Sequence, residues 1–218
     1  MKRRFFRMAA AMLAGLCMGA VLTGCSSSGT RGGEQQATEA AGATNGSTFV
    51  ITLHPDVAPI TCENFQTLVE QGFYDGLTFH RVVDDFMAQG GDPQGTGMGG
   101  SEQTIKGEFS SNGVDNTLSH TRGVVSMARS SDPDSASSQF FICYDDCTFL
   151  DGSYAAFGEV TEGMEVVDDF LKVERVVGND GAVSSPTSPI IMEKVEMIDP
   201  AENGDPRVQV TMNDFLAK

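Results

Sequence analysis

The chain has 218 residues, of which 40% are hydrophobic, enough for one globular domain of moderate size with appendages. Its formal net charge is −16. Phosphate backbones and anionic lipid surfaces attract Lys and Arg, so this acidic balance argues against a nucleic-acid-binding protein.

The chain opens with a predicted targeting segment. Four basic residues among the first seven precede an apolar stretch over residues 8–22, which is typical of a secretion signal and short for a membrane span. The sequence Leu-Thr-Gly-Cys at 22–25 resembles the lipobox of bacterial lipoproteins. That resemblance implies removal of residues 1–24 and attachment of lipid to Cys25. The alternative is an ordinary cleaved signal with a chance cysteine.

A flexible tether is expected to follow. Residues 26–47 contain no large apolar side chain, so they cannot bury enough surface to offset the entropy of ordering. We therefore expect lipidated Cys25 and a tether over 25–47. This arrangement predicts a lipid-anchored protein of the cell envelope, on the extracytoplasmic face of the membrane.

Folded structure is expected to begin near Thr48. Alternating apolar residues over 49–53 predict a strand, and a helix is predicted over 59–71, with Pro59 in its first turn and Gly72 past its end. A second helix is predicted over 163–171. Short apolar runs between turn residues predict further strands at 77–83, 86–89, 124–128, 139–143, 155–160 and 190–198.

Two later segments carry weaker signals. Residues 176–189 are rich in Gly, Ser and Pro and predict a surface loop. Residues 200–218 form an acidic C-terminal extension for which the pattern gives no role.

Apart from Cys17 and Cys25, the chain has an odd number of cysteines, Cys62, Cys143 and Cys147, which argues against a disulfide framework. Free thiols are the simpler interpretation, and a Cys143–Cys147 pair is the alternative.

Short blocks in the middle of the chain resemble the cyclophilin family. They are Phe79-His80-Arg81, Phe86-Met87-Ala88-Gln89-Gly90-Gly91-Asp92, Gly95-Thr96-Gly97, Ser126-Met127-Ala128, Ser138-Gln139-Phe140-Phe141-Ile142, Phe149-Leu150-Asp151-Gly152 and Phe157-Gly158. The resemblance covers residues 48–199. It implies a mainly β fold, a closed eight-stranded antiparallel barrel capped by two α-helices, with a peptide-binding groove on its outer surface.

The implied activity is peptidyl-prolyl cis-trans isomerisation. Rotation about a peptide bond crosses a barrier of ~18–20 kcal/mol but breaks no covalent bond, so no nucleophile, metal or cofactor is expected. The enzyme must favour the twisted amide, whose prolyl nitrogen gains a usable lone pair. By resemblance, Arg81 donates to that nitrogen, since a guanidinium presents several N–H groups in a fixed fork.

The resemblance also assigns the residues that hold the substrate. Phe86, Met87, Phe141 and Leu150 would form a pocket for the proline ring. Gln89 and Gln139 would bind the substrate backbone and hold Arg81, while Ala128 and the main chain of Arg129 would line the neighbouring subsite. Taken singly, Met87 and Leu150 are better explained as core residues. His80 is expected to be structural, because the reaction transfers no obligatory proton.

Three positions depart from the family pattern. Phe149 stands where many cyclophilins carry Trp, Tyr154 where many carry His, and Arg129 where Asn is common. Phe149 and Tyr154 are still expected in the groove. Because the family Trp is linked to tight cyclosporin binding, we expect weaker inhibition by this drug.

The expected partners are proline-containing peptides and unfolded exported proteins, with the protein itself a monomer. A noncatalytic proline-binding or chaperone module tethered at the membrane is the alternative function. Binding alone would not require Arg81, so this residue separates the two hypotheses. The three His residues lie at no metal-ligand spacing, so no metal site is expected.

Overall fold

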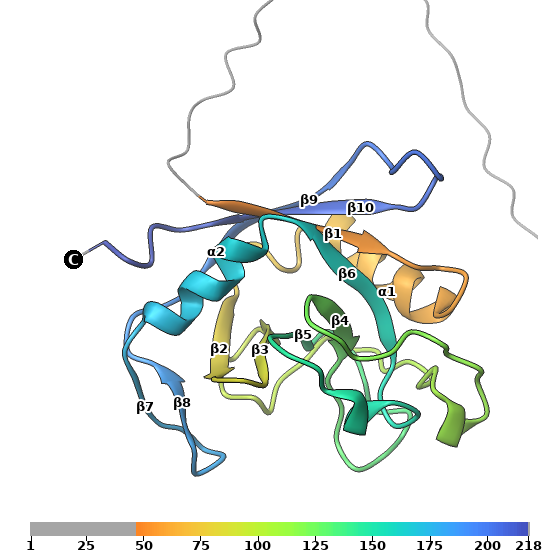
Figure 1. Ribbon diagram of the computed structural model, residues 1–218, viewed down its shortest axis with the longest axis horizontal. Coiled ribbons are helices and arrows are strands. Elements are labelled where there is room, and N and C mark those ends of the chain that lie inside the picture. Colours follow the sequence, from red (N-terminus) through yellow and green to blue (C-terminus); the bar gives the residue numbers. More distant parts are fainter. Residues whose placement is uncertain (1–46, 218) are drawn as a thin grey trace, which may run out of the picture. The chain divides into compact units, whose positions relative to one another are not determined.

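The computed structural model describes residues 47–217, so the expected signal segment, Cys25 and nearly all of the tether lie outside the described residues. A curled antiparallel sheet encloses the core, and helices α1 (Pro59–Glu70) and α2 (Met164–Asp168) lie toward opposite ends of it (Figure 1). Within the described range, no helix combines the length and apolar character needed to cross a membrane.

The sheet has eight strands in the order β2-β3-β5-β4-β6-β1-β10-β9. Their bounds are β1 Thr48–Leu53, β2 Thr78–Val83, β3 Met87–Asp92, β4 Val124–Met127, β5 Phe140–Cys143, β6 Ala156–Glu162, β9 Met192–Ile198 and β10 Arg207–Met212. A separate hairpin pairs β7 (Arg175–Val177) with β8 (Val183–Pro186), and three 3-10 helices complete the elements, η1 Ser110–Asn112, η2 Thr148–Leu150 and η3 Asp169–Lys172.

The sheet is an open, curled half-barrel, so the expectation of a closed barrel is wrong. Its edge strands β2 and β9 share no ladder; an isolated bridge joins Thr78 to Ile191. Three backbone hydrogen bonds accompany this bridge, from Phe79 N–H to the Ile190 carbonyl, from Met192 N–H to the Leu77 carbonyl and from Gly76 N–H to the Met192 carbonyl. Further along β2, strand β8 packs against it and the ladder does not continue.

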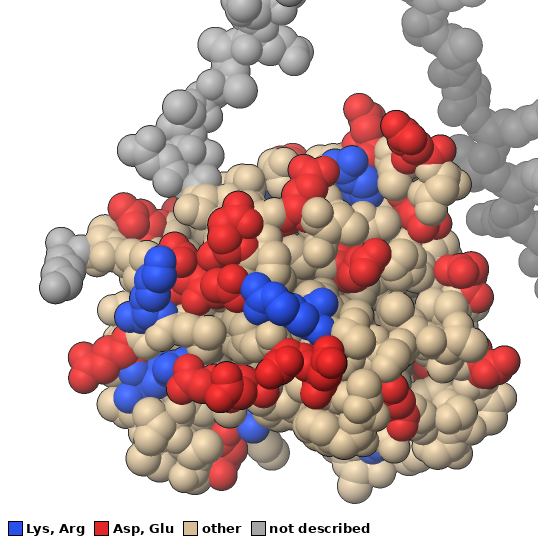
Figure 2. All heavy atoms as spheres, in the orientation of Figure 1, with Lys and Arg blue, Asp and Glu red and all other residues tan. Residues whose placement is uncertain are grey.

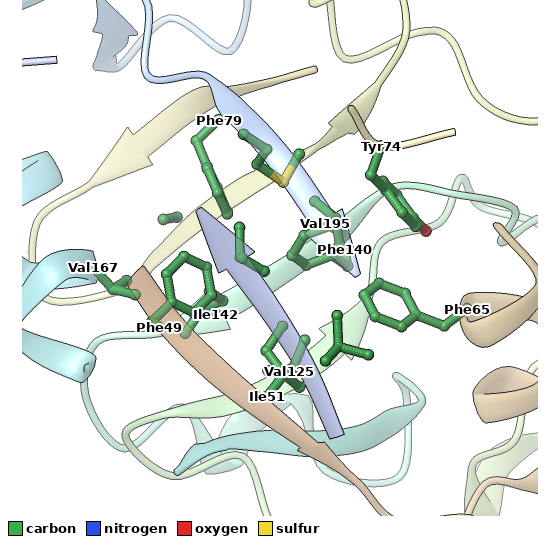
Figure 3. Close-up of a cluster of buried hydrophobic side chains, with 14 of the residues drawn as sticks. Phe49, Ile51, Phe65, Tyr74, Phe79, Val125, Phe140, Ile142, Val167 and Val195 are labelled. Atoms are coloured by element: carbon green, nitrogen blue, oxygen red, sulfur yellow. The ribbon is translucent and has the colours of Figure 1, made fainter. Parts of the chain in front are cut away.

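Aromatic side chains from both ends of the half-barrel fill its interior (Figure 3). From α1, the Phe65 ring lies 5.4 Å from that of Phe140 and 5.1 Å from that of Phe157, measured between centroids. From η3, the Phe170 ring lies 4.8 Å from that of Phe79. The helices therefore cover the two ends of one core, because each inserts a large apolar side chain between the strands.

Helix α1 begins without a side-chain cap of its own. Pro59 occupies its first turn, and buried Glu108 from a distant loop accepts hydrogen bonds from the Ile60 and Thr61 backbone N–H groups at 3.1 and 2.7 Å. At the other end the chain turns at Gly72, whose φ of +67° suits glycine. Both predicted helices are confirmed, the second as α2 continued by η3.

The C-terminal segment is part of the sheet rather than an appendage. Strand β10 pairs with β1 on one side and β9 on the other, and Val208, Val210 and Met212 are fully buried. Val-Gln-Val-Thr-Met over 208–212 alternates as a half-buried strand should, so the pattern was present in the sequence. Likewise, the surface loop expected at 176–189 contains most of the β7–β8 hairpin.

The three cysteines of the described range are free and buried. Burial raises the pKa of the Cys62 thiol to about 12 and also raises those of Cys143 and Cys147. Since the thiolate is the reactive form, these side chains behave as small packed hydrophobes. This agrees with the free-thiol interpretation of the sequence.

Candidate functional site

Strand β2 presents Arg81 on the outer surface through a β-bulge. Phe79 pairs with Gly90 and Arg81 with Gln89, which leaves His80 as an extra residue. In a regular strand, residues 79 and 81 would share one face. The extra residue reverses this alternation, so Phe79 enters the core at 1% exposure while the Arg81 side chain stays 31% exposed.

The register of the sheet aligns three of the expected site residues. Arg81 of β2 lies opposite Gln89 of β3, and Gln89 lies opposite Phe141 of β5. Residues directly opposite each other in neighbouring strands share a face. The outer surface therefore carries a guanidinium, an amide and an aromatic ring side by side.

A pocket with an apolar wall and a polar rim opens beside Arg81. It is a cavity of about 190 Å³, lined by Arg81, Phe86, Met87, Gln89, Ala128, Arg129, Phe141, Leu150 and Tyr154. Met87, Phe141 and Leu150 are buried and pack in a cluster separate from the main core, together with Cys143 and Cys147. These three side chains thus form the wall of an outer pocket and fill no part of the barrel interior.

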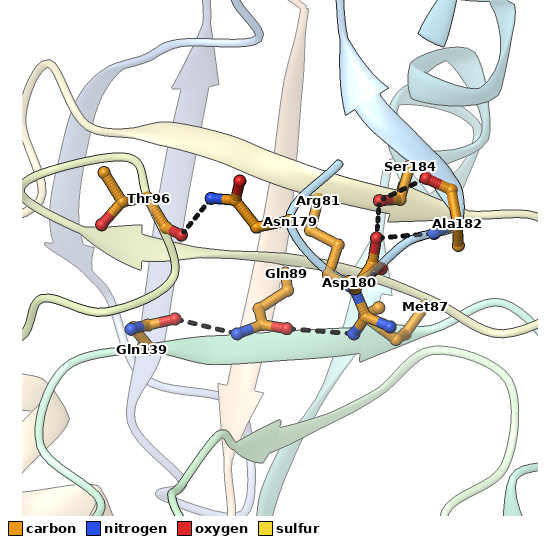
Figure 4. Close-up of polar contacts among 9 residues, drawn as sticks. All are labelled: Arg81, Met87, Gln89, Thr96, Gln139, Asn179, Asp180, Ala182 and Ser184. Carbon is orange, nitrogen blue, oxygen red and sulfur yellow. Dashed lines mark hydrogen bonds and ion pairs between the residues drawn. The ribbon is translucent and has the colours of Figure 1, made fainter. Parts of the chain in front are cut away.

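A chain of amide groups holds the Arg81 guanidinium (Figure 4). Arg81 Nη1 donates to Gln89 Oε1 at 3.3 Å, Gln89 Nε2 donates to Gln139 Oε1 at 2.8 Å, and Gln139 Nε2 donates to the Gly99 carbonyl at 2.7 Å. Arg81 Nη1 also lies 3.9 Å from Met87 Sδ. Gln89 and Gln139 thus form a continuous series of hydrogen bonds from Arg81 to Gly99, so the loop after β3 helps to orient the guanidinium.

That loop is itself fixed by one carboxylate. Asp92 accepts backbone hydrogen bonds from Gln94, Thr96, Gly97 and Gly99 at 2.7–3.2 Å. Burial raises the pKa of Asp92, but these N–H groups outweigh that effect and hold it below its usual range. The glycine-rich segment is thereby a rigid wall beside the groove.

A second cavity, of about 290 Å³, adjoins the first. It is lined by Gln89, Gly97, Met98, Gly99, Ala128, Arg129, Ser130, Ser135, Ser137 and Gln139. Gln89, Ala128 and Arg129 border both cavities. An extended peptide with its proline in the first cavity could therefore place a neighbouring residue in the second.

The side chain of Arg129, and not only its main chain, builds the groove. Its Cζ lies 4.7 Å from the Tyr154 ring centroid and 5.2 Å from that of Phe109. Nε and Nη2 donate to the Ser153 carbonyl at 3.1 and 2.9 Å. The departures at Arg129 and Tyr154 are thus one stacked unit, in which a cation covers an aromatic face.

Phe149 lies at the rim. Its side chain is 71% exposed and does not line the proline-sized pocket, although its ring centroid is 5.7 Å from that of Phe86. The structure thus brings together every other expected groove residue and leaves Phe149 beside the entrance.

Two histidines near the site favour the neutral form: His120 is buried, and His80 is half-buried with both ring nitrogens enclosed. His80 has no hydrogen-bond partner for either ring nitrogen among the described residues, and burial lowers its pKa. His120 contacts Asp151 Oδ1 through Nδ1 at 2.8 Å and Ser126 Oγ through Nε2 at 2.9 Å, and burial lowers its pKa as well. Ser126 is completely buried, so this Ser-His-Asp arrangement supports the Phe141 ring from behind and offers no exposed nucleophile.

One site residue escaped the sequence analysis. Asp180, at the tip of the β7–β8 hairpin, accepts a hydrogen bond from Arg81 Nε at 2.6 Å. The sequence Asp180-Gly181 between Val-containing runs is a hairpin signal. Nothing in the sequence, however, says which surface such a hairpin approaches.

Acidic side chains dominate the visible charge of the molecule. On the face in Figure 2, Asp and Glu are spread widely while Lys and Arg form a few separate spots, in keeping with the net charge of −16. Several basic residues on the surface are paired, among them Arg122 with Asp168 and Arg175 with Asp84. This face therefore offers no extended positive surface to an anionic partner.

Comparison with known proteins gives a consistent result. The family model described as cyclophilin type peptidyl-prolyl cis-trans isomerase matches residues 40–197. Peptidyl-prolyl cis-trans isomerase-like 1 of Neurospora crassa is 46% identical over 132 residues, covering 60% of this chain and 79% of the relative. Peptidyl-prolyl cis-trans isomerase B of Bacillus subtilis is 42% identical over 139 residues, covering 62% and 94%.

Among solved structures, a cyclophilin type peptidyl-prolyl cis-trans isomerase of Cryptosporidium parvum is similar, with a TM-score of 0.60 and 30% sequence identity. The match covers 68% of this chain and 94% of that protein, whose crystal structure was determined in the presence of the dipeptide Ala-Pro. The family match ends at residue 197, so strand β10 lies beyond it.

Proposed function

The chain belongs to the family of cyclophilin-type peptidyl-prolyl cis-trans isomerases, and we propose that it catalyses prolyl isomerisation with Arg81 as the transition-state donor. The observation that carries this assignment is the position of the Arg81 guanidinium at the mouth of the apolar pocket, where Gln89 accepts from one of its nitrogens.

The geometry suits a reaction that only twists a bond. The proline ring sits against Met87, Phe141 and Leu150, where its apolar surface leaves water, while the preceding residue rotates. As conjugation is lost, the prolyl nitrogen gains a lone pair, and an Arg81 N–H donates to it. This bond forms only in the twisted state, so it lowers the barrier without tightening ground-state binding.

The neighbouring groups supply orientation. Gln89 and Gln139 offer amides to the peptide backbone while holding Arg81, and the second cavity takes a residue flanking the proline. The crystal structure of the Cryptosporidium parvum relative in the presence of Ala-Pro supports proline-containing peptides as ligands. We therefore take X-Pro segments of unfolded proteins as the substrate.

Substitution of Arg81 tests this assignment. Arg81→Ala is expected to lower kcat/KM for a proline-containing peptide by about 10²-fold, the usual effect of removing one transition-state donor. Arg81→Lys should recover little, because an ammonium lacks the planar fork. Arg122→Ala, which breaks an exposed ion pair with Asp168, serves as a matched control and should leave the rate unchanged. Wild-type activity in Arg81→Ala would overturn the assignment.

We also propose that the protein works outside the cytoplasm on a lipid anchor at Cys25. The support is the basic and apolar start of the chain, the Leu-Thr-Gly-Cys sequence at 22–25 and the polar tether. Uncatalysed prolyl isomerisation takes tens to hundreds of seconds, so exported proteins folding at the membrane would benefit.

Labelling of cells with a radioactive or clickable palmitate tests the anchor. The wild-type protein should incorporate label and sediment with membranes, whereas Cys25→Ala should lose the label. Cys17→Ala, a cysteine inside the expected signal, is the matched control and should keep it. An unlabelled wild-type protein would exclude the anchor and leave the isomerase assignment intact.

A further inference from the structure

The β7–β8 hairpin brings a carboxylate to Arg81. Asp180 Oδ2 accepts from Arg81 Nε at 2.6 Å, on the side of the guanidinium away from Gln89 (Figure 4). The Asp180 and Arg81 side chains are only 24% and 31% exposed. The hairpin is one wall of a further cavity of about 420 Å³ that His80 and Arg81 also line.

The Asp180 carboxylate is itself held in place. Its Oδ1 accepts from Ser184 Oγ at 2.8 Å and from the Ala182 backbone N–H at 3.0 Å, while Gly178 N–H donates to the Ala182 carbonyl to close the turn. The hydrogen bond from Arg81, with these neighbours, lowers the pKa of Asp180 to about 2. One oxygen is thus fixed by the hairpin, and the other is aimed at Arg81.

The hairpin is attached to the body of the protein independently of this contact. Arg175 Nη2 donates to both oxygens of Asp84, in the turn between β2 and β3, at 2.9 and 3.1 Å. Asn179 Nδ2 lies 3.4 Å from the Thr96 carbonyl in the glycine-rich loop. The position of Asp180 therefore does not depend on Arg81.

The guanidinium is consequently fixed from two directions. Nη1 donates to Gln89 and Nε to Asp180, whereas Nη2 makes no hydrogen bond within residues 47–217. A free Arg side chain loses rotamer entropy when it is ordered, and a fork that is already oriented loses less on binding. The unpaired nitrogen is left as a donor for the substrate.

We propose that Asp180 is a positioning residue, which acts through Arg81 by locking the guanidinium plane so that Nη2 faces the prolyl nitrogen in the transition state. This inference rests on the proposed catalytic role of Arg81. Because the contact orients a transition-state donor and does not touch the substrate, its loss lowers kcat and leaves KM nearly unchanged.

Steady-state kinetics of the full chain with a proline-containing peptide test the proposal. Asp180→Ala is expected to lower kcat about tenfold with KM within twofold, since small misplacements of catalytic groups have large effects on rate. Asp168→Ala removes the carboxylate of an exposed ion pair with Arg122 that involves neither Arg81 nor the hairpin, and as the matched control it should stay within twofold of wild type. In an Arg81→Lys background, Asp180→Ala should have no further effect.

A second measurement reports on the contact directly. In an NMR spectrum of arginine side chains, the Arg81 Nε–H signal should be protected from exchange in wild type and lose that protection in Asp180→Ala, with backbone signals of the sheet retained. An Asp180→Ala rate equal to or above wild type would overturn the proposal, and a faster rate would mean that Asp180 restrains Arg81. An equal tenfold loss in the Arg81→Lys background would also overturn it. Full activity in Arg81→Ala would instead refute the catalytic role itself.

Discussion

At the scale of single residues, the site depends on one extra residue in a strand. The bulge at His80 turns Arg81 outward while Phe79 stays in the core. Phe79 therefore contributes to packing, and Arg81 contributes to the groove. The half-buried His80 lines a cavity together with Arg81 and the glycine-rich loop, and its ring nitrogens are enclosed. Its contribution is geometric, since a bulge re-aims the side chain that follows.

Substitution of Phe149 is expected to strengthen the binding of cyclosporin. Its exposed ring lies at the rim, beside Phe86, and lacks an indole N–H. Phe149→Trp is expected to tighten cyclosporin binding by roughly fivefold, the effect of one added hydrogen bond of about 1 kcal/mol, with peptide turnover little changed. Inhibition curves for both proteins measure this, with Phe149→Tyr as the control aromatic. Equal inhibition constants for wild type and Phe149→Trp would contradict the prediction.

At the scale of elements, two segments from the last third of the chain complete the structure around the site: strand β10 within the sheet and the β7–β8 hairpin beside it. Strand β10 occupies the position between β1 and β9, and the hairpin takes the place beside β2 where a closing ladder would run. The open edge of the sheet is thus the edge that carries Arg81. The hairpin that packs against this edge also delivers Asp180 to the site.

Truncation tests the role of β10. A chain ending at Asp199 loses the hydrogen-bonding partner of β1 and β9 and three buried side chains, each contributing about 1.5–3 kcal/mol of burial. Against a typical stability of 5–15 kcal/mol, we expect loss of cooperative unfolding and of isomerase activity. Urea denaturation followed by circular dichroism measures this. A chain ending at Leu216, which keeps β10 and Phe215, should remain folded, and a stable Asp199 truncation would refute the role.

At the scale of the whole molecule, buried neutral histidines and ionised carboxylates set the pH range of stability. Burial lowers the pKa values of His80 and His120, whereas hydrogen bonds hold those of Asp92, Asp151 and Asp180 below their usual range despite opposing burial at Asp92 and Asp151. At neutral pH the histidines and the carboxylates are both in the charge state that the fold favours. As the pH falls, protonation lowers the free energy of unfolding first through the histidines and then, at lower pH, through the carboxylates.

The free energy of unfolding is therefore expected to fall as the pH drops from 7 to 5. An unfolded histidine takes up a proton near its ordinary pKa of ~6.5, while burial lowers the pKa of His80 and His120 in the folded chain, so protonation favours the unfolded chain. The carboxylates lose their contribution only below about pH 4. Urea titrations at pH 7, 6 and 5 measure the decline, and His120→Gln should reduce it. A constant free energy across this range would contradict the assignment.

The sequence by itself determined the family, the strand and helix content and most of the groove. Period-2 and period-3.6 patterns decide which face of each element is apolar, and the short blocks from Phe79 to Gly158 carry the pocket residues. Strand β10 was also within reach of this reasoning, because residues 208–212 alternate cleanly. Acidic and polar residues flank this short strand signal on both sides, so composition alone indicates an exposed extension there.

The tertiary structure alone decided whether the sheet closes, which residue is the extra one in β2, and what stands beside Arg81. The first and the last depend on contacts between residues far apart in the chain, Thr78 with Ile191 and Arg81 with Asp180, the latter separated by 99 positions. The extra residue depends on how Arg81 pairs with Gln89 across the β2–β3 hairpin. Local patterns fix how a segment folds and which side it buries. Local patterns do not say which distant segment packs against the polar side of a given segment, because many partners can satisfy the same hydrogen-bonding groups.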